Sequence, residues 1–420
     1  MGAEQTLIGS ERSTRQQADA PSAGLLTRSG LPAAQLWRLD PAYRHLNHGS
    51  FGAVPTATLE KQAEFRAQME ANPVKWFVEL PGHVARARAA VAHRLGAEPG
   101  SAALVANASA GASIVYRTLL AERRPVHVVT TDHGYGAVTM GAERLARESG
   151  GTASRVHIPL DATPEDVLGR LETHLAANRA DLLVVDQVTS PTARAFPTAA
   201  ICDLAHAHGV RVLVDGAHSP GVLPAAIETK ADAWVGNLHK FWCAPRGTAV
   251  IAAHETAAGP ALDLMPLIDS WGATLGYPER FDHQGTLDLT AWLAAPHAAE
   301  HLEHEIGWDA IRSHSAAMMD LAEHEVGAAL AESGVEDPVP DVGQAVGPMR
   351  LLRLPGERTW THDEVDALRV PFMDSTGLVV SFTEFEGRAY VRLSAHAYTT
   401  PDDIQAMASS GVPALVRGIG

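Results

Sequence analysis

Gly236-Asn237-Leu238-His239-Lys240-Phe241-Trp242 is the stretch that decides the fold, because it sets one lysine directly after a short apolar run, 231–235. Such a run is typical of a buried strand. A lysine at the end of a buried strand is partly desolvated, which lowers the pKa of its ammonium group and frees the amine as a nucleophile. We therefore expect Lys240 to be chemically reactive.

A second apolar run, 212–214, ends in the carboxylate of Asp215, which precedes Lys240 by 25 residues. That spacing is about one αβ unit, so both side chains should reach the same edge of a parallel sheet, where α/β proteins bind ligands. A lysine that can bond an aldehyde and an acid that can pair with a pyridinium nitrogen are what pyridoxal phosphate (PLP) requires. The pair therefore predicts a PLP site.

Length and charge limit the partners of this chain. Its 420 residues exceed one ordinary domain and favour two. The formal net charge of −16 argues against nucleic acid or an anionic membrane as a partner and leaves a small-molecule substrate open. No apolar run approaches the roughly 20 residues of a membrane span, and the N-terminal residues contain no apolar core of a signal peptide.

Cysteine usage limits the chemistry further. Only Cys202 and Cys243 occur, which excludes a disulfide framework and a thiolate zinc site, so no metal centre is expected. Scarce cysteine fits a reducing compartment, and we expect a cytoplasmic protein.

Three parts are expected along the chain. Residues 1–30 are polar and mixed in charge, which predicts a flexible N-terminal arm. Residues 31–295 alternate helix-like and strand-like segments, which predicts a large α/β domain with a mostly parallel sheet sandwiched by helices. Residues 296–420 predict a smaller α+β domain. The expected strands are 126–130, 182–188, 210–214, 231–235, 248–252, 349–353, 378–382 and 388–394, and the expected helices are 55–71, 83–95, 113–120, 137–148, 164–175, 198–208 and 311–330.

Small and hydroxyl residues precede the helix expected at 113–120. The segment Asn107-Ala108-Ser109-Ala110-Gly111-Ala112 would expose backbone N–H groups, which together with the helix dipole make an anion site. By itself such a segment is more often an ordinary N-cap without a ligand. Beside the lysine and the aspartate, we interpret it as the site of the cofactor's phosphate.

Two more of the expected strands end in polar residues, Asp132-His133-Gly134-Tyr135 and Asp186-Gln187-Val188-Thr189-Ser190-Pro191. His133 or Tyr135 could stack on a planar cofactor, although a single histidine is more often a satisfied loop residue. Four strand ends that turn polar at one edge of the sheet predict a ligand site more strongly than any one of them.

Three basic side chains are further candidates. His218, three residues after Asp215, could donate to the phenolate oxygen of the cofactor, and His239 could bind its phosphate. Arg392, in a short alternating strand, could hold a substrate carboxylate through two hydrogen bonds, although a solvated surface arginine is the commoner case.

Together these motifs resemble those of the class V aminotransferase-fold PLP enzymes, and within them the isopenicillin N epimerase-like group. The resemblance runs over residues 40–410. The matching segments are Leu46-Asn47-His48-Gly49-Ser50-Phe51-Gly52, Asn107-Ala108-Ser109, Asp186-Gln187-Val188-Thr189-Ser190-Pro191, Asp215-Gly216-Ala217-His218, His239-Lys240-Phe241-Trp242-Cys243-Ala244-Pro245-Arg246-Gly247, Gly285-Thr286 and Val391-Arg392-Leu393-Ser394. The resemblance implies PLP fold type I.

The resemblance also implies a role for each matching residue. Lys240 would bond PLP and move protons at the substrate Cα, Asp215 would pair with the pyridinium nitrogen, and His133 would stack on the ring; these are the expected catalytic residues. The other expected cofactor contacts are Ala108, Ser109, Asp186, His218, Asn237, His239, Gly285 and Thr286, the last two from a second subunit. The expected substrate contacts are Asn47, His48, Ser50, Tyr135 and, for the carboxylate, Arg392. A homodimer with shared sites is implied too.

Two features separate the chain from parts of that superfamily. The interface motif is often Gly-Thr-Arg-Asp and is here Gly285-Thr286-Leu287-Asp288, so an arginine among the usual substrate contacts is missing. Cysteine desulfurases need a nucleophilic cysteine on a mobile loop of the small domain. Cys202 is expected in a helix of the large domain and Cys243 within a packed motif, so persulfide transfer is not expected.

Removal of the Cα proton of an amino acid opens several reactions. Our first hypothesis is a C–S lyase that eliminates the β-substituent of an S-substituted cysteine or a similarly bulky amino acid in a secondary-metabolite pathway, as in antibiotic biosynthesis. An amino-acid epimerase is a nearly equal alternative, and an aminotransferase or decarboxylating deaminase is third. A non-catalytic PLP-fold binding protein is disfavoured because the lysine and the aspartate are both present.

Overall fold

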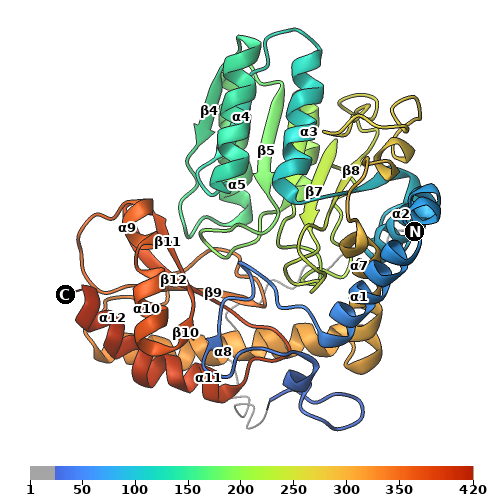
Figure 1. Cartoon of the computed structure of the whole chain (residues 1–420). Helices are drawn as coiled ribbons and strands as arrows, with labels where there is room; N and C mark the ends of the chain where they lie inside the picture. The colour runs from blue at the N-terminus through green and yellow to red at the C-terminus, as the bar shows by residue number, and fades with distance from the viewer. Residues whose placement is uncertain (1–23, 420) are drawn as a thin grey trace, which may run out of the picture.

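The computed structural model describes residues 24–419, which fold around a seven-stranded sheet (Figure 1). In spatial order the strands are β2 (Ala102–Val105), β8 (Ala249–Ala253), β7 (Ala233–Asn237), β6 (Arg211–Asp215), β5 (Leu182–Asp186), β3 (Val128–Thr131) and β4 (Ala153–Val156). All run parallel except β8, which is antiparallel to both of its neighbours. The apolar strands β5 and β7 are buried along their whole length, as a sheet covered on both faces requires.

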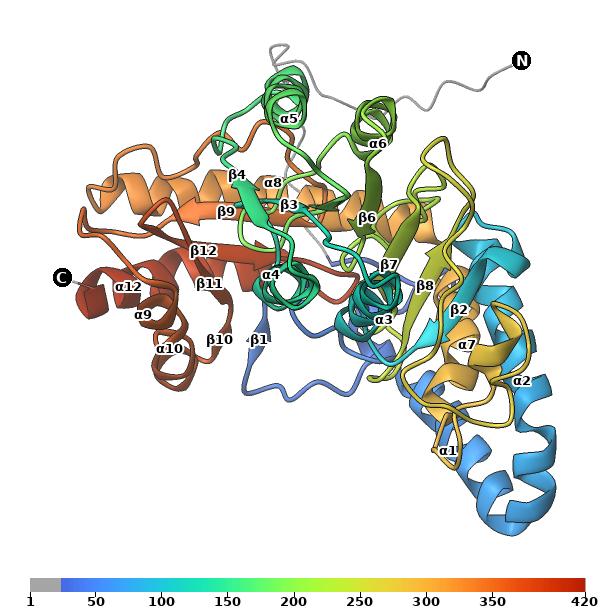
Figure 2. The ribbon, with the colours of Figure 1, turned by 90° about the horizontal axis from the view of Figure 1, so that it is seen from above.

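Helices cover both faces of this sheet (Figure 2). α3 (Ala108–Ala121) and α4 (Gly136–Ser149) lie on one face, and α5 (Pro164–Ala177) and α6 (Thr198–Ala207) lie on the other. A separate apolar cluster fills each of the two interfaces. The result is the predicted three-layer α/β arrangement.

Two N-terminal helices, α1 (Thr56–Ala71) and α2 (Pro73–Arg94), project from the sheet with α7 (Thr290–Glu305) packed alongside them (Figure 2). The side chain of Asn72 accepts a hydrogen bond from the Lys75 N–H and starts α2, and Pro73 occupies the first turn, where its missing N–H costs no helical bond.

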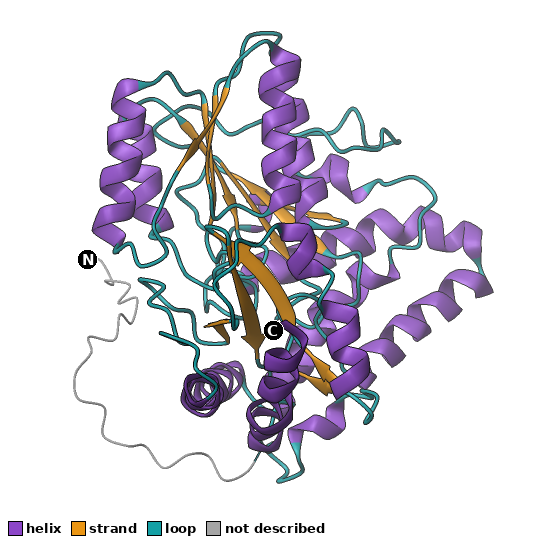
Figure 3. Cartoon of the chain, turned by 90° about the vertical axis from the view of Figure 1, so that its left-hand side faces the viewer, coloured by secondary structure: helices purple, strands orange, loops and turns teal. Residues whose placement is uncertain are grey.

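A smaller antiparallel sheet, in the order β11 (Ser381–Phe385), β12 (Arg388–Ser394) and β9 (Met349–Arg353), packs with the long helix α8 (Trp308–Glu332) around a third apolar cluster. Figure 3 shows the helices around the outside of the two sheets. The remaining elements of this part are α9 (His362–Asp366), α10 (Arg369–Thr376), β10 (Leu378–Val379), α11 (Pro401–Ala406) and α12 (Val412–Ile419).

The segment before α1 joins this smaller part although it lies far away in the sequence. β1 (Arg44–His45) pairs in parallel with β10, and the Ser394 side chain accepts a hydrogen bond of 2.8 Å from the Gly49 N–H. Residues 46–50 are thereby placed at the end of β12, where Arg392 lies.

The predicted strands and most helices are confirmed to within a few residues, and the differences have local causes. α3 begins at Ala108, five residues before the predicted start, because the side chain of Asn107 accepts from the Ala110 N–H. α2 begins at Pro73 rather than near His83, because Pro81 lies inside the helix without ending it. The predicted strand 378–382 is two strands. The elements that were not predicted are β1, β2, β4, α7, α9, α10, α11 and α12.

Of the predicted N-terminal arm, residues 1–23 lie outside the described residues. Residues 24–30 are described, and the Arg28 N–H donates to the Glu305 carbonyl at 2.7 Å. The predicted division between residues 295 and 296 falls inside α7 and stays a prediction. Between residues 24 and 419, no helix is both long and apolar enough to cross a membrane.

Candidate active site

The carboxyl ends of β5, β6 and β7 bring the predicted acid and lysine together. Asp186 and Asp215 are register partners on adjacent parallel strands, and Lys240 follows the end of β7 by three residues. Because parallel strands end at a common edge, these groups meet as the sequence predicts.

Lys240 is partly buried, and its Nζ lies 2.9 Å from His218 Nε2. Burial and the nearby guanidinium of Arg392 lower the pKa of Lys240 to about 7, against the opposing attraction of Asp215 and Asp186. About half of the amine is therefore unprotonated at neutral pH, which is the state that can act as a nucleophile or base.

Asp215 has one free oxygen. Its Oδ1 accepts from the Ala217 N–H at 2.9 Å, whereas Oδ2 is buried and has no hydrogen-bond partner among residues 24–419. Burial raises the pKa of Asp215, and burial together with the adjacent Asp215 raises that of Asp186 well above its usual range. A buried acceptor without a donor costs stability unless a ligand supplies the donor.

His218 is buried between two backbone carbonyls. Its Nδ1 lies 3.3 Å from Val188 O and its Nε2 3.1 Å from Gly49 O. Burial, followed by Lys240 and Arg392, lowers the pKa of His218 well below its usual range, so the ring is neutral.

Arg392 is a buried guanidinium whose hydrogen bonds go to neutral oxygens. It donates to Ser190 O at 2.6 Å and to Ser50 Oγ at 2.8 Å, and its Nε is buried with no partner in the described part of the chain. Burial and Arg369 lower its pKa to about 10. Among the described residues no carboxylate forms an ion pair with it, so the charge is ready for an anionic ligand.

A family model described as Aminotransferase class-V matches residues 52–338. The chain belongs to the class-V aminotransferase family. It is 28% identical over 392 residues to an isopenicillin N epimerase of Streptomyces clavuligerus, a match that covers 89% of this chain and 95% of that relative.

Two further comparisons bear on the fold and the chemistry. A probable chloroplastic L-cysteine desulfhydrase of Arabidopsis thaliana is 28% identical over 290 residues, covering 65% of this chain and 61% of that relative. An apo cysteine desulfurase from Thermococcus onnurineus NA1 has the same fold, with a TM-score of 0.69, 18% identity, and coverage of 90% of this chain and 95% of that one. The predicted PLP fold type I is confirmed.

Class-V aminotransferases are PLP enzymes, which confirms the predicted cofactor and that the chain is an enzyme. The residues present fit the group, because the free Oδ2 of Asp215 offers the acceptor that a pyridinium N–H needs and Lys240 offers the amine. When bound, PLP supplies an electron sink for the charge that develops at the Cα of an amino acid.

The predicted phosphate side lies at the N-terminus of α3, as in other anion sites of this kind. The Ala108 N–H donates to Asn237 Oδ1 at 2.9 Å, which ties the start of α3 to the end of β7. Ser109 is only partly buried, and His239 Nδ1 lies 3.1 Å from Thr248 O. The phosphate contacts of these residues stay predictions.

His133 and Tyr135 differ in exposure. None of the surface of His133 is exposed, its ring nitrogens lie 2.7 Å from Thr192 Oγ1 and 2.8 Å from Ile158 O, and Phe385 packs on the ring. Tyr135 is 45% exposed at the start of α4. The stacking role that the sequence predicts for His133 or Tyr135 stays a prediction, and of the two rings only that of Tyr135 is exposed.

The other residues predicted to contact the substrate or the cofactor also differ in their surroundings. Asn47 Oδ1 and Ser50 Oγ both face Arg392, at 3.4 and 2.8 Å, whereas His48 is buried behind Lys240. Gly285 and Thr286 are exposed, and their predicted role requires a second subunit. Ser190, which accepts a hydrogen bond from Arg392, lies within a motif that the sequence analysis quotes but is not one of the predicted site residues. His396 is not predicted either, because no sequence pattern distinguishes it from the other histidines among the 21 in the chain.

Proposed function

We propose that this enzyme is a PLP-dependent C–S lyase that eliminates the β-substituent of an S-substituted cysteine or a similarly bulky amino acid. The observation that carries the proposal is that the buried Arg392 guanidinium, which pairs with no carboxylate among residues 24–419, lies close enough to the Lys240 amine at the end of β7 to lower its pKa. Arg392 would bind the α-carboxylate, and Lys240 would take the Cα proton. Loss of the thiolate from Cβ would follow.

The similarity to a cysteine desulfhydrase supports cleavage of a C–S bond. A persulfide route is not supported, because Cys202 and Cys243 are both buried and burial raises the pKa of each thiol.

Epimerisation is the second candidate, favoured by the match to an isopenicillin N epimerase over nearly the whole chain. Both reactions begin with removal of the Cα proton, and they differ only in the step that follows.

We further propose that the enzyme is a homodimer that works in the cytoplasm as part of a biosynthetic pathway.

The test is to incubate the loaded enzyme with S-substituted cysteines in D2O and to measure thiol, pyruvate and ammonia together with deuterium at Cα. Release of thiol and pyruvate in equal amounts is expected. Alanine, which has no β-leaving group, is the control and should only exchange its Cα proton. Deuteration with loss of optical purity and no thiol release would reject the lyase in favour of the epimerase.

A further inference from the structure

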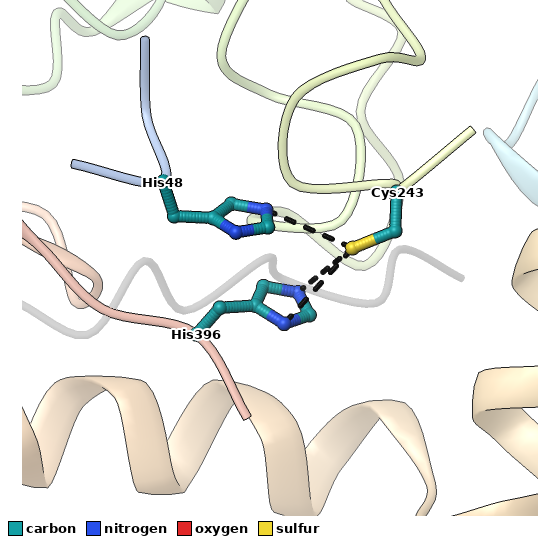
Figure 4. Close-up of side chains that lie close together, drawn as sticks. All are labelled: His48, Cys243 and His396. Atoms are coloured by element: carbon teal, nitrogen blue, oxygen red, sulfur yellow. Dashed lines mark hydrogen bonds between the residues drawn. The ribbon is translucent and has the colours of Figure 1, made fainter. Parts of the chain in front are cut away.

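A second cluster of buried side chains lies directly behind Lys240. His48, Cys243 and His396 come from three separate segments and converge on the Cys243 thiol (Figure 4). Cys243 Sγ lies 3.7 Å from His48 Nε2 and 3.5 Å from His396 Nε2, and the two imidazole rings stack with their centroids 4.1 Å apart.

The residue types would suit a metal ion, but the ring geometry favours hydrogen bonds. A metal bound by imidazole lies near the ring plane, and the planes of two stacked rings only 15° from parallel meet far beyond coordination distance. Both Nε2 atoms also face carbonyls, His48 at 3.1 Å from Lys240 O and His396 at 3.2 Å from Phe241 O. Each nitrogen must carry a proton to donate there, and a protonated nitrogen cannot bind a metal.

Lys240 O and Tyr398 set the position of the proton on His48. Because the carbonyl of Lys240 can only accept, the single proton of the neutral ring lies on Nε2. His48 Nδ1 then accepts from the hydroxyl of Tyr398 at 2.8 Å, and burial keeps the pKa of Tyr398 well above its usual range, so the phenol has a proton to donate. Burial lowers the pKa of His48 and of His396, so both rings are neutral.

Other donors hold the neighbouring peptide groups. His239 O accepts from the Gly52 N–H at 3.1 Å, and Lys240 O also accepts from the Cys243 N–H at 2.9 Å. The fit is close, because a Cβ on Gly52 would come within 2.2 Å of Lys240 O. Three consecutive carbonyls, at 239, 240 and 241, are therefore held by donors from other segments of the chain, namely Gly52, His48 and His396.

We propose that His48 and His396 are positioning residues. Together they form a clamp that holds the backbone of Lys240 at a fixed distance from Arg392, where the substrate carboxylate would bind. The two histidines lie on the segments that carry that site. His48 directly follows Asn47 and lies two residues before Ser50, both of which contact Arg392, and His396 follows Arg392 by four residues. The clamp thus sets the distance between the lysine amine and the bound carboxylate, on which access to the Cα proton depends. The inference rests on the proposed roles of Lys240 and Arg392.

The test compares His48→Gln with His48→Asn. Glutamine places an amide donor near the position of Nε2 and asparagine near that of Nδ1, so the two variants differ mainly in whether Lys240 O keeps its donor. A leucine at position 48 or 396 removes the donor outright. His254→Leu is the matched control, because His254 Nδ1 faces Ala231 O, near the opposite end of β7, at 3.1 Å.

Two properties are measured. In the cofactor-free protein, the pH midpoint for acetylation of Lys240 by acetic anhydride and the hydrogen exchange of the 239–243 amides are expected to change in His48→Asn and His396→Leu. In the loaded enzyme, the rate of Cα proton exchange should fall about tenfold, as for loss of one hydrogen bond, while KM for the amino acid changes less than twofold. His48→Gln and His254→Leu should behave like the wild type.

Unchanged acetylation midpoints and exchange rates in His48→Asn and His396→Leu would overturn the proposal. So would one equivalent of zinc or copper in the purified wild type that is lost in His48→Asn, because Nε2 would then be a ligand. If the midpoints shift as expected but no amino acid exchanges its Cα proton on the wild type, the clamp is supported and the proposed function fails.

Discussion

Replacing Lys240 by methionine should stabilise the cofactor-free protein at neutral pH. The side chains have similar length, but methionine carries no charge to desolvate. The pKa of Lys240 is lowered from 10.5 in the unfolded chain to about 7 in the folded one, chiefly by burial and next by Arg392. A residue that serves the reaction therefore weakens the fold that holds it.

The sign and the size of this stabilisation follow from the linkage between proton binding and folding. A base with a lowered folded pKa binds fewer protons when folded, so its destabilisation is complete below the folded pKa and disappears as pH rises to the unfolded pKa. With values of about 7 and 10.5, the cost is about 4 kcal/mol at pH 7 and below about 1 kcal/mol at pH 10. The advantage of Lys240→Met should shrink by roughly 3 kcal/mol over that interval.

Urea unfolding of the cofactor-free wild type and of Lys240→Met, followed at pH 7, 8.5 and 10, measures this difference. Lys230→Met is the matched control, because Lys230 is exposed and its hydrogen bond to Asp203 raises its pKa. That variant should be no more stable than the wild type at pH 7. If the stability curves of wild type and Lys240→Met run parallel from pH 7 to pH 10, the assignment of a neutralised buried amine is wrong.

Three further outcomes are expected. Asp215→Ala should lower the rate of Cα proton removal about 100- to 1,000-fold, measured by deuterium exchange, and near-wild-type exchange would contradict the role of its free Oδ2. Arg392→Lys should raise KM for amino acids about 10- to 100-fold because an ammonium cannot replace two parallel hydrogen bonds; an unchanged KM would return Arg392 to a structural role. Cys202→Ser and Cys243→Ser should retain thiol release from S-substituted cysteines, since both thiols are buried; loss of activity with fold and PLP retained would instead favour a desulfurase.

Much of the fold could be predicted from the sequence because it rests on local patterns. Short apolar runs separated by helical segments specify parallel strands, and the ends of such strands meet at one edge. Asp215 and Lys240 could therefore be assigned to a common site from the strand pattern alone, and the free oxygen of Asp215 agrees with that assignment.

The surroundings of those residues depended on contacts between distant segments. Arg392 is held by Ser50, 342 residues earlier, and by Ser190, 202 residues earlier, and no periodicity links such positions. Only packing showed that His133 is enclosed and that His48 faces the carbonyl of Lys240 rather than the substrate side. By itself the sequence determined which residues end the strands, because strand formation follows local apolar pattern. Tertiary structure decided which side chains are desolvated and which donors they meet, because burial depends on segments that approach only in the folded chain.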